Sequence, residues 1–149
     1  MKNLTESQLR SIRSTIYVVE EKLRDMEALV YFTLEHREKG IEITLEHDFT
    51  AYELMAFQHN VKEIKNTLWR ISETYGLQTE QISLKHLIRS KAAFIGEDVT
   101  GANFDRLKGH GEVDESLREE YETLFNRLTR QTDELIIKLN EYIYENQTL

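Results

Sequence analysis

Apolar residues recur at intervals of three and four along three long stretches of the chain, and this spacing constrains the fold more than any other feature. Side chains at such intervals line one face of an α-helix, whereas a half-buried strand would show a period of two. The three series are Leu9, Ile12, Ile16, Val19, Leu23, Met26 and Val30; Leu54, Phe57, Val61, Ile64, Leu68, Ile71 and Tyr75; and Leu117, Tyr121, Leu124, Leu128, Gln131, Leu135, Leu139 and Tyr142, in which only Gln131 is polar. The pattern predicts three long amphipathic helices with coiled-coil-like heptads.

Capping residues predict where these helices begin and end. Thr50 precedes Glu53 by three residues, an arrangement in which each side chain can accept a hydrogen bond from the other residue's backbone amide. Further candidate signals are the pair Thr5 and Gln8, Gly40, Gly76 and Asp114. The chain has no proline, which suits long uninterrupted helices. We therefore expect helices over residues 5–38, 50–75 and 114–145.

The first connection, residues 40–49, contains a short extended segment at 41–46. Ile41, Ile43 and Leu45 alternate there with polar residues, a pattern typical of a strand. We favour a loop that lays these three side chains over the end of a helical bundle. The alternative is that the segment pairs with its own copy in a second subunit, because an unpaired strand edge is a template for association.

The second connection, residues 82–113, is expected to hold a short helix over residues 83–95 followed by a glycine-containing segment. The glycines match neither the P-loop nor the dinucleotide-binding spacing. Residues 103–107 could form one helical turn. Whether segment 96–113 is functional or disordered is left open, because long loops in compact domains are commonly one or the other.

These elements predict an all-α fold, an up-and-down antiparallel bundle of three long helices plus one short helix. At 149 residues the chain is of the size of one domain, so we expect a single helical-bundle domain over residues 1–149.

Composition argues against several classes of function. The net charge is -8 and no basic stripe offsets it, so we expect no nucleic-acid partner. The longest apolar run, residues 28–32, is too short to span a bilayer, and residues 1–10 have no apolar core of a signal peptide. We expect a soluble cytoplasmic protein with no membrane partner. The absence of cysteine excludes disulfides and thiolate catalysis.

The histidines give no indication of a metal site. Di-iron helical bundles use Glu-x-x-His pairs on core-facing positions, and the chain contains none. His59 should point about 160° away from Val61, which lies on the apolar stripe of its helix. We therefore expect neither a metal nor a cofactor.

His86 is the one histidine with a candidate chemical role. On a helix over residues 83–95 the apolar residues share one face, and His86 should project from the opposite face into solvent. Arg89, Ser90 and Ala93 follow it by one to two turns, and the last two are small. An imidazole placed in this way is accessible to a docking partner that transfers a group to it.

Residues 86–96, with the sequence HLIRSKAAFIG, resemble the phosphoacceptor motif of histidine phosphotransfer domains. The resemblance covers eleven of 149 residues, and Arg89 and Ser90 stand where the motif has lysine and glycine. It implies a helical bundle in which His86 carries a phosphoryl group to or from a response regulator. Arg89 would then help to neutralise the phosphoryl charge, and Mg²⁺ would belong to the partner. The predicted helix is shorter than the one that bears the histidine in that family.

The favoured function is nevertheless non-catalytic. Several helices carry more apolar surface than one bundle seam requires, and exposed apolar patches generally mark contacts. We predict a protein-interaction or regulatory module, not an enzyme, that associates with a protein partner or with itself as a homo-oligomer. A histidine phosphotransfer protein acting through His86 is the alternative.

Overall fold

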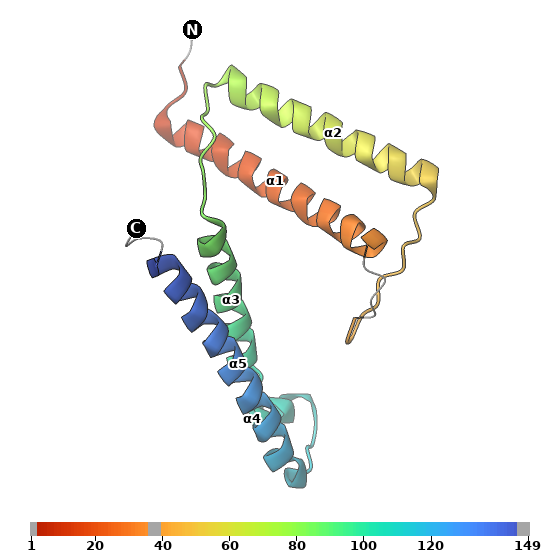
Figure 1. The fold of residues 1–149 in the computed structure, drawn as a ribbon, viewed down its shortest axis with the longest axis vertical. Helices are drawn as coiled ribbons and strands as arrows, with labels where there is room; N and C mark the ends of the chain where they lie inside the picture. The colour runs from red at the N-terminus through yellow and green to blue at the C-terminus, as the bar shows by residue number, and fades with distance from the viewer. Residues whose placement is uncertain (1–2, 36–39, 146–149) are drawn as a thin grey trace. The chain divides into compact units, whose positions relative to one another are not determined.

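The computed structural model describes residues 3–35 and 40–145, and the predicted all-α fold is confirmed for them, since none forms a strand. These described residues form five α-helices (Figure 1). They are α1 (Glu6–Glu35), α2 (Ala51–Thr74), α3 (Leu84–Gly101), α4 (Phe104–Leu107) and α5 (Arg118–Glu145). No helix among the described residues is long and apolar enough to cross a membrane.

The chain divides into two compact units, Met1–Thr79 and Glu80–Leu149, which are described separately. The structure therefore does not confirm the packing of three long helices and one short one in a single bundle. That arrangement, and the single domain over residues 1–149, stay predictions.

In the first unit, α1 and α2 run antiparallel to each other (Figure 1). Leu23 on α1 and Val61 on α2 are buried, and both belong to the predicted apolar series. Lys65 Nζ of α2 and Glu27 Oε1 of α1 form an ion pair at 2.5 Å. The geometry of this contact does not meet the criteria for a hydrogen bond. The two helices are thus held by a narrow apolar seam with a charge contact beside it.

The predicted helix starts in this unit are confirmed. Thr50 Oγ1 accepts a hydrogen bond from the amide of Glu53 at 3.1 Å, and Glu53 Oε1 accepts one from the amide of Thr50 at 3.2 Å. Thr5 and Gln8 form the same reciprocal arrangement before α1. Gly76 follows α2 with a φ of 64°, in the left-handed region that glycine adopts without steric cost. The predicted end of the first helix at residue 38 lies outside the described residues, as does His36.

Segment 41–46 forms no strand, in agreement with the loop that we favoured. Ile41, Ile43 and Leu45 are nevertheless exposed, so they do not cover other residues of the unit as expected. Alternation alone does not make a strand, because a strand needs a partner for its backbone groups. Pairing with a second copy stays a prediction.

In the second unit, α3 and α5 form an antiparallel hairpin closed by α4 and by two short 3-10 turns, Lys108–His110 and Glu115–Leu117. The helices pack where α3 has small residues: Ala92 is buried, and Gly96 lies beside α5. A Cβ on Gly96 would lie 3.6 Å from Thr132 Cγ2 and 3.7 Å from Ile136 Cδ1. The two helices therefore approach each other closely at Gly96.

Helix α3 is longer than the sequence suggests. It spans 18 residues and includes segment 96–101, which we expected to be a loop. The prediction is wrong because Gly96 lies in the seam, where packing against α5 outweighs the low helix propensity of glycine. The single turn predicted at residues 103–107 is confirmed as α4, with Asn103 Oδ1 accepting from the amide of Arg106 at 3.0 Å. Asp114 caps the 3-10 turn before α5.

Substitution of Gly96 tests this seam. Gly96→Ala should stabilise the protein by about 0.5–1 kcal/mol, because alanine is a better helix former and its Cβ fits at ordinary contact distance. Gly96→Leu should destabilise it by about 1–3 kcal/mol through overpacking against α5. Urea unfolding followed by circular dichroism measures both. Destabilisation by alanine would contradict the seam geometry.

Candidate functional site

The apolar stripe predicted along α5, which begins with Leu117 in the 3-10 turn directly before the helix, is mostly exposed. Its members at the surface are 41% to 53% exposed: Leu117, Leu124, Leu128, Leu135 and Tyr142. In an isolated unit with two helices, this stripe therefore lacks a neighbour along most of its length.

Helix α5 packs toward α3 through a second series of residues, of which the sequence analysis had named only Leu139. They are half-buried or buried and follow the same intervals: Phe125, Thr129, Thr132, Ile136, Leu139 and Ile143. The two threonines in this series donate their hydroxyl protons to the helix's own carbonyls, those of Phe125 and Leu128, so they are satisfied inside the seam. At 100° per residue this series lies roughly 85° around the helix from the exposed stripe. Alternation of three and four over positions 125–143 was the signal that could have found it.

Helix α3 has an exposed apolar stripe as well. Ala92 and Gly96 lie in the seam with α5, while Leu84, Ile88 and Ile95 are 69%, 42% and 50% exposed. At 100° per residue, the exposed stripe of each helix is displaced from its seam in the same rotational sense, by roughly 80° on α3 and 85° on α5. Because the helices are antiparallel, the two stripes lie on one side of the hairpin.

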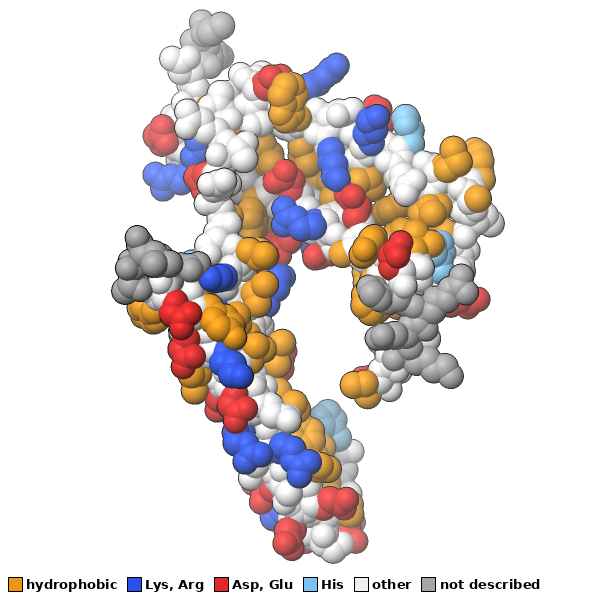
Figure 2. Space-filling view, in the orientation of Figure 1, with side chains coloured by type: hydrophobic (Ala, Val, Ile, Leu, Met, Phe, Trp, Pro, Cys, Tyr) orange, Lys and Arg blue, Asp and Glu red, His pale blue; other side chains and the backbone are white. Residues whose placement is uncertain are grey.

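We call this side the hairpin face, made of Leu84, Ile88, Ile95, Leu117, Leu124, Leu128, Leu135 and Tyr142. Apolar side chains follow the length of the hairpin in Figure 2. A surface of this kind can bind another amphipathic helix, because it offers knobs at helical spacing along two ridges.

His86 lies on α3 about 180° from the exposed stripe, and the prediction that it is exposed is confirmed. Its amide donates to Ser83 Oγ at 3.4 Å, and its carbonyl accepts from Ser90 Oγ at 3.1 Å. Arg89 and Ser90 are exposed beside it. The structure brings the three predicted residues together on one helix, but the hydroxyl of Ser90 is occupied by the backbone.

Near the same side of the hairpin a shallow hollow of about 560 Å³ lies between α3 and α5. Two carboxylates, those of Glu97 and Asp133, and Thr100 line it together with small or apolar residues. Within residues 3–35 and 40–145, no three His, Cys, Asp or Glu side chains are arranged to hold a metal ion.

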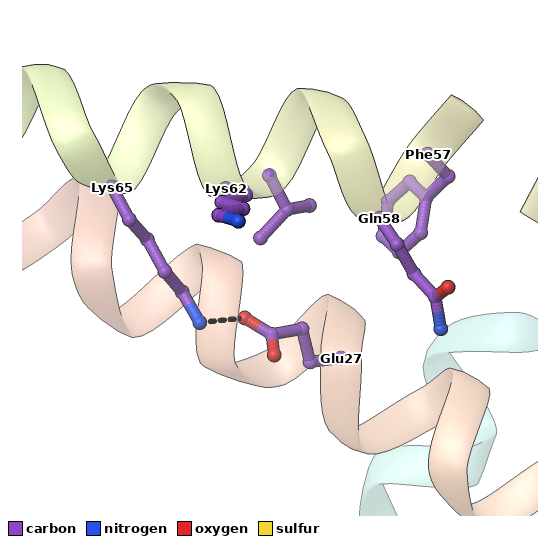
Figure 3. A pocket seen from close by; sticks show the side chains of 6 residues that line it. Glu27, Phe57, Gln58, Lys62 and Lys65 are labelled. Atoms are coloured by element: carbon purple, nitrogen blue, oxygen red, sulfur yellow. Dashed lines mark ion pairs between the residues drawn. The ribbon is translucent and has the colours of Figure 1, made fainter. Parts of the chain in front are cut away.

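The first unit has a smaller hollow of about 220 Å³ beside the ion pair between α1 and α2 (Figure 3). Glu27 points toward Lys65 beside it, and the rest of the wall comes from α2: Phe57, Gln58, Val61 and Lys62. The ion pair beside this hollow joins the two helices.

The end of the hairpin is fixed by a cluster of charges around Arg118. Its guanidinium donates to Glu115 Oε2 at 2.8 Å, to Asp105 Oδ1 at 2.9 Å and to Glu122 Oε1 at 3.3 Å. The same group lies 4.5 Å from the ring centroid of Phe104, which is buried against α5. This cluster ties α4 and the 3-10 turn to the first turn of α5.

The cluster shifts the acid equilibria of its members. Hydrogen bonds from Arg118 and Lys108 lower the pKa of Glu115 to about 2, and the hydrogen bond from Arg118 and its positive charge also lower the pKa of Asp105. The hydrogen bond to Glu115 and its negative charge raise the pKa of Lys108. A carboxylate whose pKa is depressed in the folded state stabilises that state at pH values above its ordinary pKa.

Acid should therefore loosen this end of the hairpin. The contribution of Glu115 is fully present above its ordinary pKa of 4.5 and is lost as the pH falls toward about 2. Glu115→Gln should lower the unfolding midpoint at pH 6, and the difference from wild type should vanish near pH 2. Thermal unfolding across this pH range measures the effect. Glu112→Gln is the control, because it makes the same charge change in the same connection. Glu112 forms no ion pair in the described part of the chain. An equal effect of both variants would contradict the role of the cluster.

Comparison of the chain with protein-family models, with curated proteins and with solved structures finds no match. The functional proposals therefore rest on three features of the second unit. They are the apolar face on one side of the hairpin, the exposed histidine on the other side, and the charge cluster at the end of the hairpin.

Proposed function

We propose that the protein is a non-catalytic interaction or regulatory module that associates with a second copy through the hairpin face. The observation that supports this is the exposed stripe of α5, which keeps heptad spacing from Leu117 to Tyr142. Contiguous exposed apolar surface on proteins generally marks a contact. Full burial of a leucine side chain contributes about 1.5–3 kcal/mol of stability. Because the leucines of the stripe are about half-exposed, burial of the exposed half of each would contribute roughly 1 kcal/mol to the free energy of association.

Helix α5 has two apolar faces, which supports a helical bundle as the structure that this association forms. Each helix of an antiparallel bundle packs against two neighbours. On α5 one seam is occupied by α3, and the second, roughly a quarter-turn away, is open. The up-and-down packing of long helices is thus part of the proposal, with the missing neighbour supplied by helix association. A cytoplasmic location stays a prediction.

Solution mass tests this proposal. Sedimentation equilibrium over a wide concentration range should show a wild-type protein that dimerises. Leu128→Ser should weaken the dimer roughly tenfold or more, because two copies of the side chain leave the interface. Ile137→Ser is the matched control, since Ile137 is exposed on the same helix about 160° from the stripe. A protein that stays monomeric at all concentrations would refute self-association.

Phosphotransfer through His86 is the second candidate. The observation in its favour is the exposure of His86 on a helix of 18 residues, on the side away from the hairpin face, with Ser90 and Ala93 beside it. A receiver domain could approach this side without competing for the apolar surface. The imidazole would attack the phosphorus of an aspartyl phosphate, and the aspartate carboxylate would leave.

Incubation with phosphorylated receiver domains tests this candidate. The protein should acquire a phosphoryl group that is labile in acid and stable in base, and His86→Gln should abolish the transfer. His59→Gln, which changes another exposed histidine, should leave it intact. Failure to accept the group from a broad panel of receivers would rule out this function.

A further inference from the structure

We propose that α5 packs against α5 of a second copy in antiparallel orientation, about a two-fold axis level with residues 129 and 130. This inference rests on the proposed self-association through the hairpin face and gives it a specific geometry. Three features of α5 support it: the length of its exposed stripe, the positions of its apolar residues about the axis, and the charges beside them.

The length of the stripe matches a second α5. From Leu117 to Tyr142 the stripe extends roughly 38 Å, at 1.5 Å per residue. Helix α3 has 18 residues and extends only about 27 Å, so another α3 would leave part of the stripe uncovered. Helix α5 has 28 residues, which is sufficient for the whole stripe. Of the two hairpin helices, only α5 therefore covers its counterpart from end to end.

The order of residues along the stripe fits an antiparallel pair. In such a pair the two kinds of heptad position face each other across the axis. Leu124 then lies opposite Leu135 of the second copy, and Leu117 lies opposite Tyr142 of the second copy. Near the axis Leu128 faces Gln131 of the second copy. This contact costs the pair some stability, because the amide of Gln131 is partly desolvated opposite an apolar residue.

The charges beside the stripe favour the same orientation. Arg127 and Glu134 lie on the edge of the stripe that faces away from α3, and in this register Arg127 lies next to Glu134 of the second copy. Symmetry makes the pair twice. Both residues are exposed, and neither forms an ion pair within residues 3–35 and 40–145. A parallel pair would instead place them beside Thr132 and Leu139 of the second copy, which are buried against α3.

Two of the outer charges in this geometry repel each other. Glu120 would face Glu141 of the second copy at each end of the pair. Both residues are exposed, so solvent and salt screen their repulsion. The same screening weakens the two central ion pairs, so the charges support the orientation only together with the apolar pairs along the stripe.

Cysteine cross-linking tests the orientation directly, because the natural chain has no cysteine. A mixture of Leu124→Cys and Leu135→Cys proteins should form a disulfide-linked dimer under mild oxidation. Neither variant alone should do so, since equal positions lie about 16 Å apart along the antiparallel pair, beyond the reach of a disulfide. Cross-linking of each variant alone, as a parallel pair would give, overturns the proposal.

Charge reversal tests the ion pairs. Arg127→Glu and Glu134→Arg should each weaken the dimer roughly two- to tenfold, and the double variant should restore it. Arg130→Glu is the control of equal charge change, on the side of α5 away from the stripe. Weakening that the double variant fails to restore would count against the register.

The outcomes separate the two proposals. A wild-type protein that is monomeric at every concentration removes self-association and this geometry together. A wild-type dimer that Leu128→Ser weakens, combined with cross-links in the single-cysteine samples, removes the antiparallel geometry alone.

Discussion

The narrow seam between α3 and α5 sets the geometry of the second unit. Because α3 presents Ala92 and the bare backbone of Gly96 there, Thr132 and Ile136 of α5 approach the α3 backbone closely. This contact fixes the rotation of both helices about their axes. Once the rotations are fixed, the apolar stripes must lie beside the seam and His86 must lie on the far side. The hairpin face and the exposed histidine are thus two consequences of one packing arrangement.

A second constraint acts at the closed end of the hairpin. Phe104 is buried, and Arg118 covers its ring while binding three carboxylates. The Tyr121 hydroxyl donates to the carbonyl of Ala102 at 2.6 Å and joins the end of α3 to α5. These contacts explain how a connection rich in glycine and charge can hold one conformation without a large core. They also leave the charges of the cluster occupied, which favours a structural role over a catalytic one.

More residues support self-association than support phosphotransfer. The apolar face is broad, follows heptad spacing and is carried by two helices, so association explains several residues at once. The phosphotransfer candidate depends on one histidine and its neighbours. The structure removes one objection to it, the short helix, and retains another, because Ser90 stands where the family motif has glycine and its hydroxyl is bound to the backbone.

The sequence by itself determined which long stretches are helical and where most helices begin, because backbone hydrogen bonds within a helix and capping contacts such as Thr50 with Glu53 are local. It did not predict that α3 continues through Gly96, since that depends on α5 being close. On α5, two series of residues have similar helical spacing and share Leu139, and the sequence analysis chose the series that α3 leaves mostly exposed. Only the tertiary structure decided between them, because periodicity defines the faces of a helix and the shape of the neighbouring helix selects which face is buried.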